Sequence, residues 1–539
     1  MNVLASLRLL PFVLSLTPSV ALAQTSPQPS SETQQKERIE RQLGELLRSR
    51  NELQQNLLNT QRQLQQQLEQ FDARIDALES ELGVVPYETQ SAKTEPPVAT
   101  PAPVPTPTAE PAQTQPPATR TASAPTAAGE GPPESEQQTL DQDPFDPGAG
   151  IVLARGPLGE TSIGIVGYVR YLNQGSLDKT YTDSFGRIFN LDLRNDVQLN
   201  RIQINFRGWL FDPRFRWRFY AWSQNVSQGD AAQVVIGGSF SYIFSPALTL
   251  TAGIFSLPST RSTAQSFPNW LMIDHRTMAD EFFRGSYSQG YQATGRITPT
   301  LAYNVALMNN LSQLGVSATE LDFGVNTLST ALFWMPTTGE FGPAFGFGDY
   351  EYHETPATLL GIHYTRSRED AESQPNVNGV ENSQIRLSDG TRIFSPDPFG
   401  TGGRIGKATY RMLDLDAGVK FRGWSLEGEY YFRWVDDFQL FSGPIPVTSL
   451  FDHGFQLQAS TMVIPSMLQA YLETSTVFGQ YGVPWEVGGG LTLFPFRRKQ
   501  VRMNIEAIYM HNSAIGYTAV PYQVGGKGWV FTFNVGSWF

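Results

Sequence analysis

Five arginines lie at matching positions of two neighbouring segments, on either side of the turn residues Asp212-Pro213. They are Arg201, Arg207, Arg214, Arg216 and Arg218. If the two segments form a β-hairpin, side chains alternate along each strand and all five arginines project to one side. Arginine stays charged at any relevant pH and presents a fork of donors that suits phosphate or carboxylate. Such a strip attracts anions where it lines a water-filled pore.

Four acidic residues on two later segments have the strand parity that places them on the same inner face, and we call them the acidic wall. Its members are Asp414, Asp416, Glu427 and Glu429. Two interpretations stay open. The arginines form an anion-attracting wall, or they pair with these carboxylates or anchor a loop that folds inward. Opposed basic and acidic strips would also produce a transverse field that orients dipolar solutes.

The stretch 257–287 is long, and it is too apolar and too charged for a freely exposed loop. Its titratable residues include Asp274, His275, Arg276, Asp280, Glu281 and Arg284. Folded into a lumen, this loop would narrow the channel and set its selectivity. The alternative is a surface loop that covers a neighbouring subunit.

Patterns for catalysis or metal binding are weak. The chain has no Cys and five His, and His275 and His363 are isolated in the sequence. We find no Ser-His-Asp arrangement, no Gly-rich phosphate loop and no metal-ligand spacing. A net charge of −12 does not suggest a nucleic-acid footprint. The sequence therefore predicts neither an enzyme nor a cofactor or metal site.

These residues belong to a repeated strand pattern that begins at Ile151. Sixteen segments alternate apolar with polar residues, which is typical of an antiparallel transmembrane β-barrel. They cover 162–172, 197–209, 214–226, 233–244, 247–256, 288–297, 299–309, 324–335, 357–366, 410–421, 423–435, 453–464, 466–477, 485–494, 500–511 and 527–539. Tight turns mostly alternate with long loops, which places both ends of the barrel on the periplasmic side. The connection near 336–356 is an exception, being longer and rich in Gly and aromatic residues.

A soluble β-sandwich would also alternate, but it would bury its apolar face and leave its polar face in water. Here an arginine-bearing face lies opposite a face dense in Trp and Phe, which favours water inside and lipid outside. The last segment shows the same pattern, with Trp529, Phe531 and Phe533 on one face, and the chain stops at Phe539. We expect Phe539 and its strand to act as the signal that barrel-assembly machinery recognises.

The first 150 residues have a different composition. Residues 1–24 fit a secretory signal peptide, with an apolar stretch followed by Ala21-Leu22-Ala23. Residues 33–83 contain no Pro and carry Leu, Ile and Phe at heptad spacing, which predicts a periplasmic, intermolecular coiled coil of three copies of the chain. A lone amphipathic helix packed on the barrel is the alternative. Residues 84–147 are rich in Pro, Ala, Thr and Glu and are expected to be a disordered linker.

One part of the barrel resembles the phosphate-selective porin O/P family and related porins with an N-terminal coiled coil. The resemblance rests on Leu250 to Pro258, Ile273-Asp274-His275-Arg276, Phe283-Arg284 and Gln289 to Gly295. It implies a trimeric, sixteen-stranded outer-membrane channel whose third loop folds inward. In the family, an arginine ladder and loop lysines handle the anion. Here the loop 257–287 has no Lys, which departs from the pattern for phosphate.

We therefore expect an all-β protein: a sixteen-stranded barrel, 151–539, in the outer membrane of a Gram-negative bacterium. As a homotrimeric porin in contact with outer-membrane lipid, it would pass small hydrophilic, mainly anionic, solutes. The alternative is a structural tether, in which segment 33–83 and the linker connect a plugged barrel to the cell wall. Neither hypothesis requires a cofactor or nucleic acid.

Overall fold

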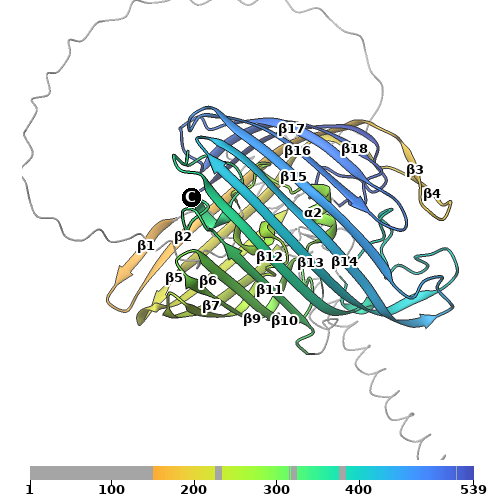
Figure 1. Ribbon diagram of the computed structural model, residues 1–539, viewed down its shortest axis with the longest axis horizontal. Helices are drawn as coiled ribbons and strands as arrows, with labels where there is room; N and C mark the ends of the chain where they lie inside the picture. Colours follow the sequence, from red (N-terminus) through yellow and green to blue (C-terminus); the bar gives the residue numbers. More distant parts are fainter. Residues whose placement is uncertain are drawn as a thin grey trace, which may run out of the picture. The chain divides into compact units, whose positions relative to one another are not determined.

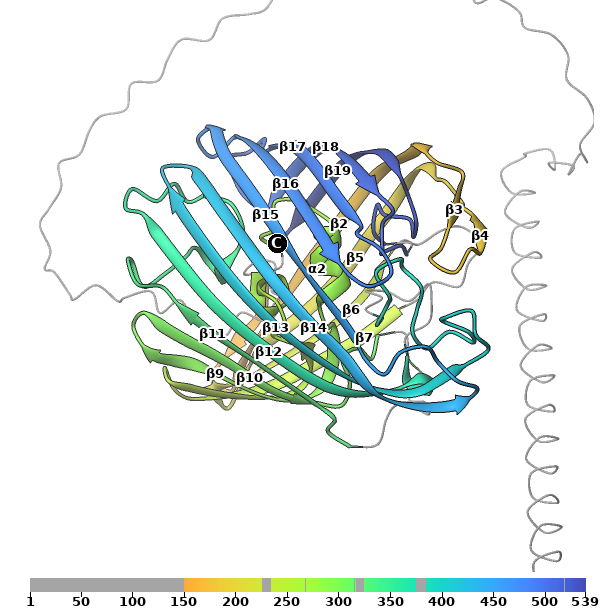
Figure 2. The same cartoon turned by 45° about the vertical axis from the view of Figure 1, so that its right-hand side comes forward.

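The computed structural model describes residues 150–224, 234–266, 268–314, 316, 324–374, 384–517 and 519–539. Within them, sixteen strands from β2 to β19 pair antiparallel in chain order and close into a barrel (Figures 1 and 2). The predicted fold class is confirmed. The predicted signal peptide, coiled coil and linker (1–24, 33–83 and 84–147) lie outside the described residues.

Every predicted segment corresponds to one strand of the ring. The ring strands are β2 (Gly159–Leu177), β5 (Asn195–Leu210), β6 (Asp212–Gln224), β7 (Val234–Ser245), β8 (Leu248–Ser256), β9 (Tyr287–Thr298), β10 (Leu301–Met308), β11 (Thr327–Trp334), β12 (Ala357–Asp370), β13 (Arg404–Phe421), β14 (Trp424–Ser442), β15 (Leu450–Ile464), β16 (Leu468–Phe478), β17 (Trp485–Leu493), β18 (Val501–His511) and β19 (Gly528–Trp538). A small hairpin, β3 (Thr180–Thr182) with β4 (Ile188–Asn190), lies in the first long loop.

The barrel closes where β19 pairs with β2, with Val535 opposite Val169. The pairing continues to the last residue, because Phe539 and Ile165 exchange two backbone hydrogen bonds of 3.1 Å. An additional strand, β1 (Ile151–Gly156), pairs with β2 and forms a hairpin with it. The C-terminal strand therefore seals the ring.

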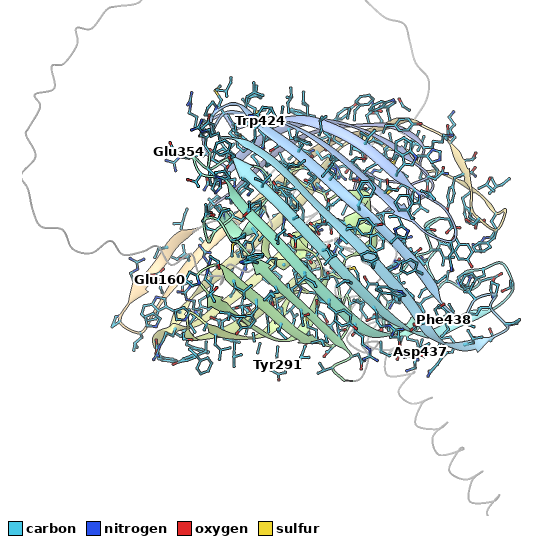
Figure 3. The ribbon with its side chains drawn as sticks, in the orientation of Figure 1. Glu160, Tyr291, Glu354, Trp424, Asp437 and Phe438 are labelled. Atoms are coloured by element: carbon cyan, nitrogen blue, oxygen red, sulfur yellow. The ribbon has the colours of Figure 1, made fainter. Side chains whose placement is uncertain are left out.

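Apolar side chains face outward and polar side chains face inward. In β19, Trp529 and Phe531 are each 45% exposed, whereas Thr532 and Asn534, which have the opposite parity, are buried. Two outward-facing aromatics, Tyr291 and Trp424, project near opposite ends of the strands (Figure 3). A soluble protein would bury these rows, so the arrangement fits a barrel surrounded by lipid.

Tight turns connect the strands at one end of the barrel. At the β13–β14 turn, Arg422 and Gly423 have φ values of 49° and 81°. Two successive residues with positive φ are required by the hairpin turn whose twist matches that of the strands, and Gly is the residue that adopts this conformation without strain. Long connections lie mostly at the other end, as predicted from the sequence.

Candidate functional site

The connection between β8 and β9 folds into the barrel interior. The Leu257 amide donates to the Ser286 carbonyl at 2.9 Å and closes the base of this loop. The loop carries a π-helical turn, Ser262–Ser266, and the helix α2, Met278–Phe283. Figures 1 and 2 show α2 within the ring of strands. We call the connection 257–286 the internal loop.

The N-terminal end of α2 is bonded directly to the barrel wall. Helices leave their first amide donors without partners inside the helix. Here the Met278 amide donates to Glu486 of β17 at 2.5 Å, and the Ala279 amide donates to Ser475 of β16 at 3.0 Å. The hydroxyl of the N-cap residue Thr277 donates to the side chain of Gln456 of β15 at 2.7 Å. Three adjacent strands therefore fix the start of this helix.

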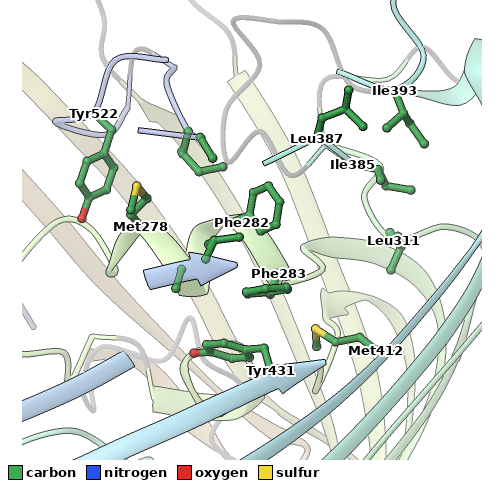
Figure 4. Packing of buried hydrophobic residues seen from close by; sticks show 14 of the residues in the cluster. Met278, Phe282, Phe283, Leu311, Ile385, Leu387, Ile393, Met412, Tyr431 and Tyr522 are labelled. Carbon is green, nitrogen blue, oxygen red and sulfur yellow. The ribbon is translucent and has the colours of Figure 1, made fainter. Parts of the chain in front are cut away.

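The C-terminal end of α2 packs through two aromatic rings (Figure 4). Phe282 and Phe283 contact each other edge to face at 5.0 Å, and Phe283 stacks on Tyr431 of β14 at 4.9 Å. The Tyr410 hydroxyl donates to the Phe283 carbonyl, and the Arg433 guanidinium lies 4.0 Å from the Phe282 ring centre. Because all of these groups are buried, the helix is held by packing as well as by hydrogen bonds.

The predicted acidic wall contacts the internal loop. The buried Arg261 forms an ion pair with Glu427 and lies 3.8 Å from Asp416. Its backbone amide points to Glu429 at 3.4 Å. Three of the four predicted carboxylates thus surround one loop arginine. The carboxylates therefore anchor an inward-folded loop, as one of the two interpretations expected, but they do so through Arg261 and not through the five arginines predicted from the sequence.

Asp414, the fourth carboxylate, lies beside a histidine that is isolated in the sequence. His363 of β12 places Nε2 at 3.1 Å from Asp416 and 3.8 Å from Asp414. Its Nδ1 lies 3.0 Å from the carbonyl of Pro258, at the base of the internal loop. The imidazole therefore connects the loop base to the acidic wall.

Of the predicted pair Asp274 and His275, Asp274 is held by β2 and β5, which lie across the lumen from the acidic wall. Arg170 of β2 donates to Asp274 Oδ2 at 2.8 Å, and Asn200 of β5 donates to the same oxygen at 2.9 Å. The other oxygen, Oδ1, lies 2.9 Å from His275 Nδ1. All four side chains are buried. The internal loop therefore spans from the β2–β5 wall to the β13–β17 wall.

The remaining predicted loop residues pair with one another. Glu281 contacts Arg276 at 3.1 Å and Arg284 at 2.6 Å, and it accepts a hydrogen bond from Tyr517 at 2.9 Å. Asp280 accepts a hydrogen bond from Thr260 within the loop at 3.0 Å. The charges of these residues are thus largely compensated inside the loop.

A second connection also enters the interior, from the end with the short turns. This is segment 335–356, between β11 and β12, whose Phe341 and Phe347 are buried. Lys420 of β13 donates to its Phe341 and Gly346 carbonyls at 2.9 and 2.6 Å. The Phe347 amide donates to the Asn269 carbonyl of the internal loop at 2.7 Å, so the two segments meet.

Segment 335–356 contains one strongly perturbed histidine. The Asp349 carboxylate hydrogen-bonds His353 Nδ1, and the Glu340 carboxylate lies 3.1 Å from Nε2. These hydrogen bonds raise the pKa of His353 to about 9. Asp349 also accepts from the Gly423 amide at 2.7 Å, which links this group to the β13–β14 turn.

Three of the five predicted arginines, Arg207, Arg216 and Arg218, occupy neighbouring inward positions of β5 and β6 near the end of the barrel that carries the short turns. Arg207 of β5 lies opposite Arg218 of β6, and Arg216 is opposite Trp209, close to the β5–β6 turn. Arg216 is exposed, Arg207 is half-buried and Arg218 is buried. Like charges placed opposite each other on neighbouring strands repel. The pairing therefore concentrates positive charge at this mouth.

The other two predicted arginines lie in different surroundings. Arg201 is buried, with its guanidinium 4.6 Å from the ring centre of Trp222. Arg214 is exposed beside the turn, where it forms an ion pair of 2.7 Å with Asp212 and lies over Tyr242. The five arginines therefore do not share one environment.

Sequence reasoning missed a set of charged residues on the inner wall. They are Arg170, Lys420, Arg433, Glu473, Glu486, Arg502 and Glu506, and all are buried. Arg502, for example, donates to the Trp270 and Pro268 carbonyls of the internal loop at 2.8 and 2.6 Å. The alternation along each strand could have identified them as inward-facing, because each one alternates with outward-facing apolar residues. His275, Glu473 and Glu506 form one group that could hold a metal ion.

Comparisons with known proteins gave structural similarities only. No protein-family model matches the chain, and no curated protein matches it. An anion-selective porin from Comamonas acidovorans is similar at 11% identity and a TM-score of 0.43, covering 71% of this chain and 100% of that one. The outer-membrane channel DcaP of Acinetobacter baumannii is similar at 9% identity and a TM-score of 0.43, covering 72% of this chain and 100% of that one. OprB of Pseudomonas putida is similar at 12% identity and a TM-score of 0.38, covering 71% of this chain and 94% of that one.

The barrel fold is assigned from the strand pairing and not from these similarities. Among the described residues, no helix is long and apolar enough to cross a membrane.

Proposed function

We propose that the protein is a passive channel in the outer membrane of a Gram-negative bacterium, and that it conducts small hydrophilic solutes with a preference for anions. The observation that carries the proposal is the direction in which side chains point along the strands. Apolar residues such as Ile202, Ile204 and Phe206 face outward, while Arg201, Gln203 and Asn205 between them face inward. A closed barrel with this pattern satisfies its backbone groups in lipid and encloses a polar interior.

The internal loop is the proposed constriction. Its attachment to β2, β5 and β13–β17 supports this role, because a loop that crosses the lumen with both ends fixed reduces the open cross-section. Its own charges, such as those of Arg276, Glu281 and Arg284, are largely paired with each other. Selectivity by charge is therefore assigned to the mouth and not to the loop.

The anion preference is assigned to Arg207, Arg216 and Arg218. Their grouping near the β5–β6 turn supports it, because a cluster of positive charge at a pore entrance raises the local concentration of anions. Phosphate selectivity is not part of the proposal, because the stretch 257–287 has no Lys. The homotrimer, recognition of Phe539 by the assembly machinery and a cell-wall contact of segment 33–83 are further parts of the proposal.

Reversal potentials in planar lipid bilayers under a KCl gradient test the anion preference. The wild-type channel should give a potential of the sign expected for Cl⁻, and Arg216→Glu should shift it toward cation preference. Arg155→Glu is the matched control, because Arg155 is exposed on the β1–β2 hairpin, where it pairs with Glu160. A cation-selective wild type, or equal shifts in both variants, would refute the assignment.

The dense packing of the interior favours one second candidate, a plugged barrel that serves as a structural tether. Wall and loop residues such as Arg170, Arg261 and Arg433 are fully enclosed. Removal of residues 25–147 separates the two functions. If the truncated barrel conducts, the channel function holds. If it carries no current and its loss loosens the cell envelope, the tether is supported instead.

A further inference from the structure

Three side chains with metal-binding atoms converge between the internal loop and the barrel wall. His275 comes from the loop, Glu473 from β16 and Glu506 from β18. One ligand atom from each lies within 4.8 Å of the other two, and all three residues are buried. The residues are too far apart in the sequence to show a metal-ligand spacing, which explains why the sequence analysis found none.

Glu473 supplies an independent sign that a ligand belongs here. The residue is 2% exposed, and neither of its carboxylate oxygens has a hydrogen-bond partner among the described residues. An unpaired buried carboxylate is strongly unfavourable unless it gains a proton or a cation. Glu486, the nearby carboxylate of β17, is by contrast already bonded to the Met278 amide and to Ser475.

The histidine is oriented as in metal sites whose imidazole is fixed by a carboxylate. His275 Nδ1 lies 2.9 Å from Asp274 Oδ1, and Asp274 is itself held by Arg170 and Asn200. This arrangement makes Nδ1 the donor and leaves the Nε2 lone pair available. Nε2 has no hydrogen-bond partner among the described residues and lies 3.4 Å from Glu506 Oε2.

The distance between the ligand atoms of His275 and Glu506 suits a small divalent cation. Zinc–ligand bonds of about 2.0–2.1 Å at tetrahedral angles place neighbouring ligand atoms about 3.4 Å apart. His275 Nε2 and Glu506 Oε2 already have this separation, and the Tyr471 hydroxyl fixes the other Glu506 oxygen at 2.9 Å. The mixed nitrogen and oxygen donor set favours a transition-metal ion over Ca²⁺, which takes oxygen ligands.

We propose that His275, Glu473 and Glu506 bind a divalent transition-metal ion of the Zn²⁺ class. The ion compensates the two buried carboxylates, with water as its fourth ligand. It connects the internal loop to β16 and β18, on the same side of the lumen as the start of α2. The site does not depend on the channel function, because a plugged barrel would carry it equally.

Metal binding by the folded, full-length protein tests the proposal. The protein is prepared in detergent without a histidine tag, treated with EDTA, dialysed and titrated with Zn²⁺ against a fluorescent chelator. We expect one Zn²⁺ per chain in the wild type and an affinity at least about 10-fold weaker in Glu473→Gln, since even second-sphere losses cost this much. Glu369→Gln, which alters a buried glutamate of β12 away from the site, should leave the affinity unchanged.

Cobalt absorption provides a second measurement that needs no variant. Co²⁺ bound at this site should give intense visible bands of a four-coordinate ion, and Zn²⁺ should displace them. Absence of stoichiometric Zn²⁺ binding and of these bands in the wild type would overturn the proposal, and would mean that Glu473 is neutralised by a proton. Equal Zn²⁺ affinity in Glu473→Gln and the wild type would also overturn it. Gel migration before and after boiling confirms that each variant is folded.

Discussion

Replacing Arg261 should release one end of the internal loop. Its guanidinium is fully buried, paired with Glu427 and near Asp416, so Arg261→Gln leaves two carboxylates without their cation. Breaking a buried ion pair by removing one partner costs about 3–5 kcal/mol. The barrel strands do not depend on Arg261 for their hydrogen bonds. The loop should therefore leave the acidic wall before the barrel itself unfolds.

The expected readout is a wider channel. Single-channel recordings of Arg261→Gln should show a higher conductance and more frequent current fluctuations than the wild type. Unfolding in urea, followed by tryptophan fluorescence in detergent, should show a separate transition at lower urea concentration for the released loop.

A double mutant provides the control for this prediction. Glu427→Gln added to Arg261→Gln removes one uncompensated carboxylate and should recover part of the loss, with a coupling of about 0.5–3 kcal/mol. If Arg261→Gln leaves conductance unchanged and lowers stability by less than about 0.5 kcal/mol, a typical surface effect, then the pair does not hold the loop.

Two further outcomes follow from the contacts of the interior. Phe283→Ala should cost about 3–5 kcal/mol in the free energy of unfolding, because the ring is fully buried and stacks on Tyr431. The lipid-facing Phe240→Ala is its control, and equal losses in urea unfolding would contradict the packing argument. His353 should make stability depend on pH. Its pKa rises from 6.5 to about 9 on folding, so its contribution is fully present below pH 6.5 and is lost as the pH rises through about 9. After allowance for its partial exposure, that contribution is about 1–2 kcal/mol. Unfolding at low and high pH should show this loss in the wild type and not in His353→Gln. A loss of the same size in the variant would exclude His353 as the cause.

The strands of this protein could be located from the sequence because each one contacts two different solvents. Segment 527–539 shows how this works: Trp529 and Phe531 face outward and Thr532 faces inward, as their parity predicts. The strand ends were less well located. For example, β14 continues to Ser442, well past the predicted end at 435, because alternation fades where the strand leaves the apolar zone. The hairpin strand β1 was missed, since its short sequence lacks alternation.

The interior was harder to predict, since its contacts join residues far apart in the chain. The sequence identified the inward loop and the four acidic residues Asp414, Asp416, Glu427 and Glu429, but it did not show that the last three meet at Arg261. Strand parity gives the face of a residue, and it does not give its neighbour across the lumen. That neighbour depends on the path of the internal loop, which follows from the packing of Phe283 and the anchoring of α2.

The most direct test of the account compares two adjacent residues of β7 that face opposite sides. Ser241 lies opposite Arg216 on the inner face, and Phe240 lies opposite Trp217 and is 45% exposed on the outer face. Because the chain has no cysteine, Ser241→Cys and Phe240→Cys each introduce a single thiol. During bilayer recordings, a charged, water-soluble methanethiosulfonate reagent should change the current of Ser241→Cys stepwise and leave that of Phe240→Cys unchanged. The absence of any current would contradict the channel, and modification of Phe240→Cys alone would contradict a barrel with water inside and lipid outside.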